Sequence, residues 1–157
     1  RVRIAGGVPG NPKAERRWLR RWRSLCPSEC DDRVDFLGWL DSESLTEHYR
    51  DANLLVIPSW TETFGLSALE GMLHGVAIVA SDCPALQELL TSEGNALLYP
   101  RADREALFQQ VNRLLDEPEF ARRLATQAAR DARTHYLWEH QISAYLSAYR
   151  ELVGSEV

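Results

Sequence analysis

The chain has 157 residues, of which 45% are hydrophobic and 26% charged, and it carries a net charge of −5 at pH 7. That composition is typical of one globular domain and excludes a disordered segment, and the acidic balance argues against nucleic acid as a partner. No apolar run approaches the roughly 20 residues that a membrane-spanning helix needs, and no signal-peptide pattern opens the sequence.

The three cysteines, Cys26, Cys30 and Cys83, are an odd number without a C-x-x-C pair. They predict reduced thiols in a cytoplasmic protein. The alternative is that Cys26 and Cys30 form a redox or metal-binding pair on one helix face. The first residue is Arg1, which leads directly into an apolar run, so we expect the chain to be cut from a longer protein.

Short apolar runs that end in small or turn residues are typical of buried parallel strands. They occur at residues 2–6, 34–38, 54–59, 77–82 and, more weakly, 95–100. Helical patterns lie between them, at residues 14–26, 42–52, 66–74 and 84–90. Strands that alternate with helices predict right-handed βαβ units and a parallel sheet covered on both faces.

The predicted helix over residues 14–26 is amphipathic and strongly basic. Its apolar face consists of Trp18, Leu19, Trp22, Leu25 and Cys26. One interpretation is that the tryptophans pack on the sheet while the arginines are solvated, as on any surface helix. The alternative is peripheral contact with an anionic membrane. The residues that would make this contact are Arg16, Arg17, Trp18, Arg20, Arg21 and Trp22.

After Pro100 the pattern changes to helices alone. Asp103 is placed to cap a helix that Pro118 ends, and its apolar stripe consists of Leu107, Val111, Leu114 and Leu115. Further helices are expected over residues 120–132 and 138–153. The predicted fold is therefore α/β, a Rossmann-like doubly wound parallel sheet with C-terminal helices, and it forms a single domain over the whole chain.

In an open α/β sheet, ligands bind outside the carboxyl ends of the strands. The loops expected at those ends are Gly6-Gly7, Gly38-Trp39-Leu40, Ser59 to Gly65 and Ser81 to Pro84. Gly7 and Gly38 are candidate binding residues because glycine lets the backbone approach a ligand closely. The meeting of several such loops on one rim would indicate a binding site.

The third loop lies within "PSWTETFGLSALEGMLHG", residues 58–75. If a helix begins near Gly65, its free backbone N–H groups would attract a phosphate. Glu62 precedes that helix and Glu70 lies in its second turn, and ionised carboxylates accept hydrogen bonds from hydroxyls. Phosphate at the helix end and hydroxyls on both glutamates would describe a nucleotide-sugar. The alternative is that Glu70 is structural, since acidic residues near a helix N-terminus are stabilised by the helix dipole.

The stretch "DANLLVIPSWTETFGLSALEGMLHGVAIVASD" resembles the signature of the retaining glycosyltransferases of family 4 (group 1), which have the two-domain GT-B architecture. The matching features are Pro58-Ser59, Glu62, Phe64-Gly65, Glu70, Gly75 and the strand from Ile78 to Ser81. The resemblance extends through "DRVDFLGWL" before this stretch and through "NALLYP", Trp138-Glu139 and the helical tail after it. It implies the donor-binding, C-terminal half of a GT-B fold.

The resemblance also implies roles for individual residues. Glu70 would bind the ribose hydroxyls of a nucleoside-diphosphate sugar, and Glu62 would be the catalytic residue beside the transferred hexose-type sugar. The backbone of Thr63, Phe64, Gly65 and Leu66 would line the sugar and diphosphate. Trp39 and Leu40 would border the base, where Trp39 offers a stacking surface. No essential metal or other cofactor is expected.

The chain departs from the family at Cys83-Pro84-Ala85, where members commonly have two glycines. The arginine and lysine that bind the diphosphate in the family, and the N-terminal domain that binds the acceptor, lie upstream of Arg1 and are expected in the longer protein. The fragment alone is therefore expected to be inactive. Two alternatives to a transferase remain open: a noncatalytic nucleotide- or sugar-binding module, and a scaffold whose amphipathic helices serve only assembly.

Overall fold

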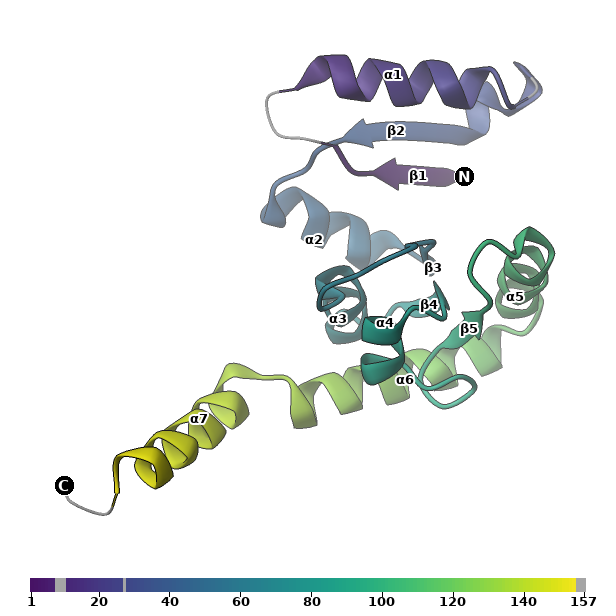
Figure 1. Cartoon of the computed structure of the whole chain (residues 1–157). Helices are drawn as coiled ribbons and strands as arrows, with labels where there is room; N and C mark the ends of the chain where they lie inside the picture. The colour runs from purple at the N-terminus through teal and green to yellow at the C-terminus, as the bar shows by residue number, and fades with distance from the viewer. Residues whose placement is uncertain (8–10, 27, 155–157) are drawn as a thin grey trace. The chain divides into compact units, whose positions relative to one another are not determined.

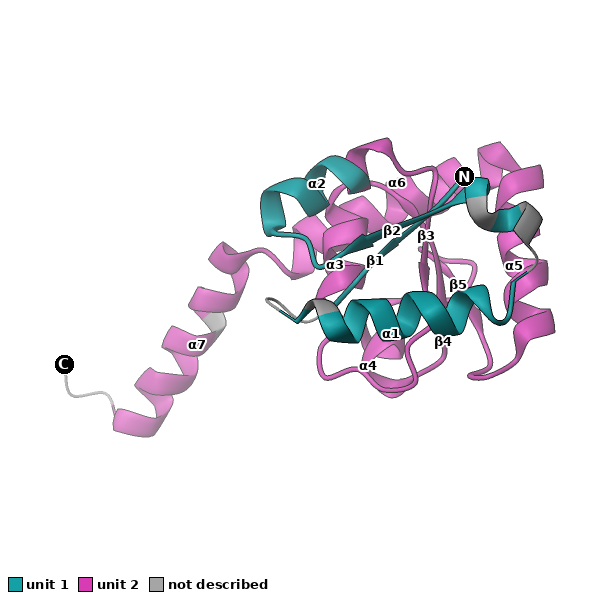
Figure 2. Cartoon of the chain, turned by 90° about the horizontal axis from the view of Figure 1, so that it is seen from above, with its two compact units in different colours: residues 1–48 teal, residues 49–157 magenta. Residues whose placement is uncertain are grey.

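The computed structural model of the chain describes residues 1–7, 11–26 and 28–154. The chain forms two compact units, Arg1–His48 and Tyr49–Val157 (Figure 2). Each unit has its own parallel sheet. The prediction of a single domain over the whole chain therefore stays a prediction.

The first unit contains a two-stranded parallel sheet covered by a helix (Figure 1). Its elements are β1 (Val2–Ala5), α1 (Pro12–Arg23), a 3-10 helix η1 (Ser28–Arg33) and β2 (Val34–Gly38), and α2 (Ser42–Asp51) follows them. The N-terminus of α1 is capped by Asn11, whose side chain accepts a bond from the Ala14 N–H. The ring of Trp22 meets that of Phe36 edge-on at 5.1 Å, so α1 packs on β2.

The second unit is built on a three-stranded parallel sheet in the order β3-β4-β5. Its strands are β3 (Leu54–Ile57), β4 (Ala77–Ser81) and β5 (Leu97–Tyr99). Its helices are α3 (Leu66–Leu73), α4 (Pro84–Leu89), α5 (Arg104–Asp116), α6 (Pro118–His135) and α7 (Trp138–Val153). The central strand β4 is buried along its whole length, which explains why its sequence is a continuous apolar run instead of an alternating one.

Alternate residues of β4 point into two separate apolar clusters, as the period of two of a strand requires. Ile78 and Ala80 lie in the cluster formed with α3 and α4, whereas Ala77 and Val79 lie in the cluster formed with α5. Helix α6 contributes to both, through Ala128 and Leu124 respectively. The sheet of this unit is thus covered on both faces.

Helix α3 approaches the sheet closely at Gly71. A Cβ atom added to Gly71 would lie 2.4 Å from Cδ2 of Leu55 and 3.4 Å from Cδ1 of Ile78. We expect Gly71→Ala to destabilise the fold by about 1–3 kcal/mol, because overpacking outweighs the higher helix propensity of alanine. Denaturant unfolding measures this change.

Gly75→Ala is the control for that substitution. Gly75 has φ +69° but no heavy atom within 4 Å of an added Cβ, so its replacement tests backbone strain alone, which costs on the order of 1 kcal/mol. A Gly71→Ala variant as stable as the unmodified chain would show that α3 does not pack tightly on β3 and β4.

Helix α7 follows α6 in the chain (Figure 1). It carries several exposed apolar side chains. These side chains are Trp138, Ile142, Tyr145, Leu146, Tyr149, Leu152 and Val153. Within the described ranges, none of the helices is both long and apolar enough to span a membrane.

The parallel α/β architecture predicted from the sequence is confirmed. The bounds of β2 and α7 coincide with the predicted ones, and Asp103 caps α5 as expected by accepting a bond from the Ala106 N–H. The differences are η1, which was not predicted, and the distribution of the strands over two sheets. Pro118 also begins α6 in addition to ending the preceding helix.

Candidate functional site

The loop between β3 and α3 brings the predicted carboxylates to the carboxyl end of the second unit's sheet. Strand β3 ends at Ile57 and α3 begins at Leu66. The turn into the helix is made by Gly65, which has φ +84° and ψ +43°. A side chain there would be strained and would meet α4, since an added Cβ would lie 2.9 Å from Cδ2 of Leu86.

The N-terminus of α3 keeps its first N–H groups available. Ala68 and Leu69 donate to the Gly65 carbonyl, at 2.9 and 3.1 Å. No side chain caps the helix in the part of the chain that the structure describes. The helical N–H groups that precede Ala68 have no carbonyl partner within the helix, as the predicted phosphate contact requires. Phe64 and Leu66 are exposed on either side of the turn.

Glu62 is held by the strand end that precedes it. The Ser59 hydroxyl donates a 2.7 Å hydrogen bond to Oε1 of Glu62. The Ser59 carbonyl in turn accepts a 2.5 Å bond from the hydroxyl of Ser81, which is buried at the end of β4. Two adjacent strand ends therefore fix the Glu62 carboxylate. Among the described residues, none donates a hydrogen bond to its second oxygen, which can accept one from a ligand hydroxyl.

Glu70 is positioned by a tyrosine from a different helix. The Tyr49 hydroxyl, at the end of α2, donates to Oε2 of Glu70 at 3.1 Å. The Tyr49 ring stacks on His74 with a centroid distance of 5.4 Å, and Nδ1 of His74 lies 2.8 Å from the Glu70 carbonyl. Half-buried Glu70 thus has one oxygen engaged by the protein and the other able to accept a further bond.

Burial, and then the negative charge of Glu70 and the bond to it, raise the pKa of Tyr49 from 10.0 to about 12. The folded chain therefore holds this proton more tightly than the unfolded chain does. The resulting stabilisation is complete below about pH 10 and is lost as the pH rises through about 12.

We expect Tyr49→Phe to remove this loss of stability. Between pH 9 and pH 11.5, the free energy of unfolding of the unmodified chain should fall relative to that of Tyr49→Phe. Urea unfolding at several pH values in this range measures the difference. Tyr145→Phe, at an exposed tyrosine of α7, is the control and should parallel the unmodified chain. Parallel curves for Tyr49→Phe as well would contradict the buried Tyr49–Glu70 bond.

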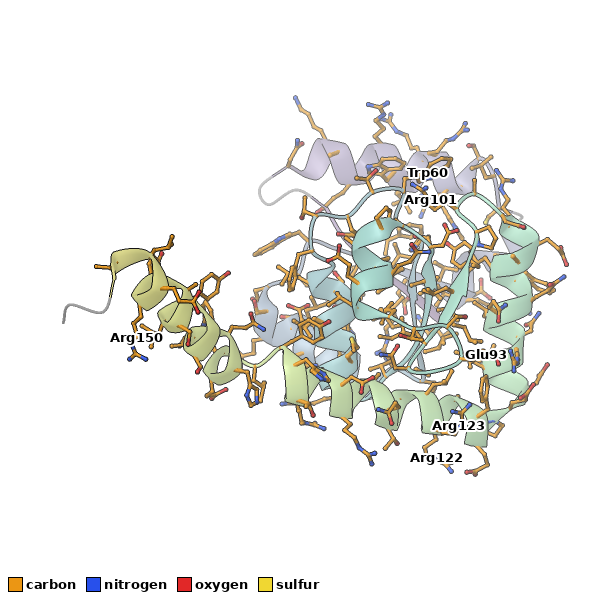
Figure 3. The ribbon with its side chains drawn as sticks, turned by 60° about the horizontal axis from the view of Figure 1, so that its bottom comes forward. Trp60, Glu93, Arg101, Arg122, Arg123 and Arg150 are labelled. Carbon is orange, nitrogen blue, oxygen red and sulfur yellow. The ribbon has the colours of Figure 1, made fainter. Side chains whose placement is uncertain are left out.

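A basic residue that sequence reasoning missed lies on the same rim. Arg101 follows β5, and its backbone N–H donates to Asp82, which follows β4, at 2.9 Å. Its guanidinium lies 3.5 Å from the Asp82 carboxylate and donates to the Trp60 carbonyl at 3.4 Å. Figure 3 shows Arg101 beside Trp60. The rule that ligands bind at carboxyl ends of strands would have pointed to this loop.

In the first unit, the structure brings Gly7, Gly38 and Trp39 together around Glu15 of α1. The Glu15 carboxylate accepts the Trp39 N–H at 3.2 Å. Added Cβ atoms at Gly7 and Gly38 would lie 2.8 and 2.9 Å from Oε1 of Glu15, and Gly38 has φ +68°. Trp39 is 50% exposed and the neighbouring Leu40 is half-buried. The positive φ of Gly38 and the Trp39 backbone nitrogen, 3.0 Å from an added Cβ at Gly7, favour glycine at both positions. Glu15 is the residue that the sequence did not indicate.

The predicted residues therefore form two groups, each ordered within its own unit. Glu62, Thr63, Phe64, Gly65, Leu66 and Glu70 surround the start of α3, and Gly7, Gly38, Trp39 and Leu40 belong to the first unit. Cys83, where the chain departs from the family, is buried and precedes α4 at its N-cap. The described residues hold the three cysteines as free thiols and contain no group of three or more potential metal-ligating side chains.

Comparison with known proteins places the chain in a family. The model of the family described as "Glycosyl transferases group 1" matches residues 1–117. The D-inositol 3-phosphate glycosyltransferase of Saccharomonospora viridis is 31% identical over 158 residues, covering 98% of this chain and 35% of that protein. The chain spans about a third of the length of the curated relatives it matches.

Two solved structures show the same fold. The sucrose-phosphate synthase of Thermosynechococcus elongatus superposes with a TM-score of 0.84 at 31% identity, covering 98% of this chain and 39% of that one. HepE of Anabaena, in complex with UDP-glucose, superposes with a TM-score of 0.79 at 21% identity, covering 93% and 40%.

Proposed function

The chain belongs to the group 1 glycosyl transferases, and we propose that it is the donor-binding part of a longer enzyme that retains anomeric configuration. The enzyme would transfer a hexose-type sugar from a nucleoside diphosphate to an acceptor bound elsewhere in the longer protein. The observation that carries this proposal is the pair of carboxylates at the start of α3, Glu62 and Glu70, each with one oxygen held by the protein. The product would belong to polysaccharide or glycoconjugate biosynthesis.

In the proposed reaction, the bond between the anomeric carbon and the diphosphate oxygen breaks, a bond to an acceptor oxygen forms, and the acceptor proton is released. The diphosphate leaves as a concentrated negative charge. The N-terminus of α3 would offset part of it, contributing on the order of 1 kcal/mol. Basic residues from the rest of the longer protein would offset more, so the proposal requires no metal ion.

The two carboxylates would divide the donor between them. Glu70 would accept hydrogen bonds from the ribose hydroxyls, and Glu62 from hydroxyls of the transferred sugar, next to the bond that breaks. HepE, which shares the fold, holds UDP-glucose, so the fold accommodates a donor of this class.

The experiment that tests this function is a transfer assay with the full-length protein and radiolabelled nucleotide-sugars. We expect label to appear in an acceptor, with the anomeric configuration of the donor retained when the product is analysed by NMR. The 157-residue chain alone should give no transfer, because donor and acceptor must be held together in one closed cleft. Specific donor binding without transfer by the full-length protein would favour the noncatalytic binding module.

A further inference from the structure

Helix α1 is strongly basic, although the chain as a whole is acidic. It carries six cations against the single carboxylate of Glu15, a net charge of +5, whereas the whole chain carries −5. The six cations are Lys13, Arg16, Arg17, Arg20, Arg21 and Arg23, and all are exposed. Glu15 is engaged at the Trp39 N–H. The six cations therefore form an exposed basic surface on α1.

The two tryptophans of α1 have different environments. Trp22 is half-buried against Phe36 and belongs to the face that packs on β2. Trp18 is 69% exposed, and Leu25, in the turn that continues the helix, is 67% exposed. Trp18, Arg21 and Leu25 follow at intervals of three and four residues, so they share one flank of the helix. This flank combines exposed apolar side chains with cations, and it borders Trp22, through which the helix packs on the sheet.

Exposed apolar side chains alone do not identify a partner, as α7 demonstrates. That helix exposes more apolar surface than α1, but its charged residues are Glu139, Arg150 and Glu151, a net charge of −1. Binding to anionic lipid requires a positive surface as well as an apolar one. Of the two helices, only α1 has both.

We propose that α1 is a contact site for an anionic lipid bilayer. Its arginines would lie at the level of the lipid phosphates, where guanidinium groups form paired hydrogen bonds. Trp18 and Leu25 would enter the interface, the region that tryptophan favours because one end of its ring is apolar and the other polar. The exposed Leu25 favours lipid over a nucleic acid, which offers no apolar layer to it.

The test is flotation of the 157-residue chain with phosphatidylcholine vesicles, with and without phosphatidylglycerol. We expect binding to the anionic vesicles only, weakened by salt, together with a blue shift of tryptophan emission. Arg17→Gln with Arg21→Gln should lower partitioning by roughly 30-fold, at about fivefold per cation removed. Arg17→Lys with Arg21→Lys keeps the charge but not the paired hydrogen bonds, and it should recover most of the binding that the glutamine variant loses.

Trp18→Ala should also weaken binding and abolish most of the blue shift. Trp138→Ala is its matched control, because Trp138 is 71% exposed on α7, a helix of net negative charge. This substitution should change neither the binding nor the blue shift. All these side chains are exposed, so circular dichroism should show folded variants. Equal binding to neutral vesicles, or unchanged binding of the Arg17→Gln, Arg21→Gln variant, would overturn the proposal, as would binding to single-stranded DNA without binding to vesicles.

Discussion

Replacing Glu62 by glutamine in the full-length enzyme should lower turnover by about 100-fold or more while leaving the affinity for the nucleoside diphosphate nearly unchanged. Removing one preorganised polar group that stabilises a transition state costs about 100- to 1,000-fold in turnover. Glu62 is preorganised because the Ser59 hydroxyl holds one of its oxygens at 2.7 Å. Its proposed partner is the transferred sugar, and the free nucleotide lacks that sugar.

The measurement is steady-state kinetics of transfer together with calorimetric titration of the nucleoside diphosphate. Glu105→Gln is the matched control, since Glu105 is a carboxylate in the first turn of α5, and it should behave like the unmodified enzyme. Equal losses for the nucleotide with and without its sugar would contradict the division of roles between Glu62 and Glu70. Ser59→Ala should give a smaller loss of turnover in the same direction.

Glu70→Ala should weaken binding of the nucleoside diphosphate by about 10- to 150-fold, which corresponds to about 1.5–3 kcal/mol for lost hydrogen bonds to a charged acceptor. The loss should be similar with and without the sugar, because the proposed partner is the ribose. Titration of full-length Glu70→Ala and of the control Glu105→Ala measures it. A folded Glu70→Ala variant with unchanged donor affinity would remove Glu70 from the site.

The effect of Glu70→Ala on donor binding must be distinguished from an effect on Tyr49, which contacts the Glu70 carboxylate. Because the Tyr49 hydroxyl bonds to the Glu70 carboxylate, Glu70→Ala also leaves that hydroxyl without this partner. Comparison with Tyr49→Phe distinguishes the two effects. The tyrosine variant should bind donor more tightly than Glu70→Ala, since it keeps the carboxylate that the ribose would contact.

The regular elements of this chain were predictable because local pattern and burial agree. The apolar run from Leu54 and that from Ala77 became parallel strands, and the helix predicted to begin near Gly65 begins at Leu66. The position of Glu62 before this helix and of Glu70 within it followed from the spacing alone. Periodicity predicts such features reliably when each element is bounded by glycine or proline.

The contacts that position the site could not be predicted in the same way. Tyr49 and Glu70 are 21 residues apart and lie on different helices, and Glu15 reaches Trp39 across 24 residues. Such pairs depend on how elements pack, which a single sequence does not encode in its local pattern. Likewise, the periodicity of α1 placed Trp18 and Trp22 on one face but did not indicate that only Trp22 would pack on the sheet.

The most direct test of a donor site at the start of α3 is calorimetric titration of the full-length protein with UDP, GDP and ADP and with their sugars. We expect saturable binding of one nucleoside diphosphate and of its sugar, strongly weakened in Glu70→Ala and unchanged in Glu105→Ala. Absence of binding to every member of the panel, or binding that Glu70→Ala leaves intact, would contradict a donor site at the start of α3.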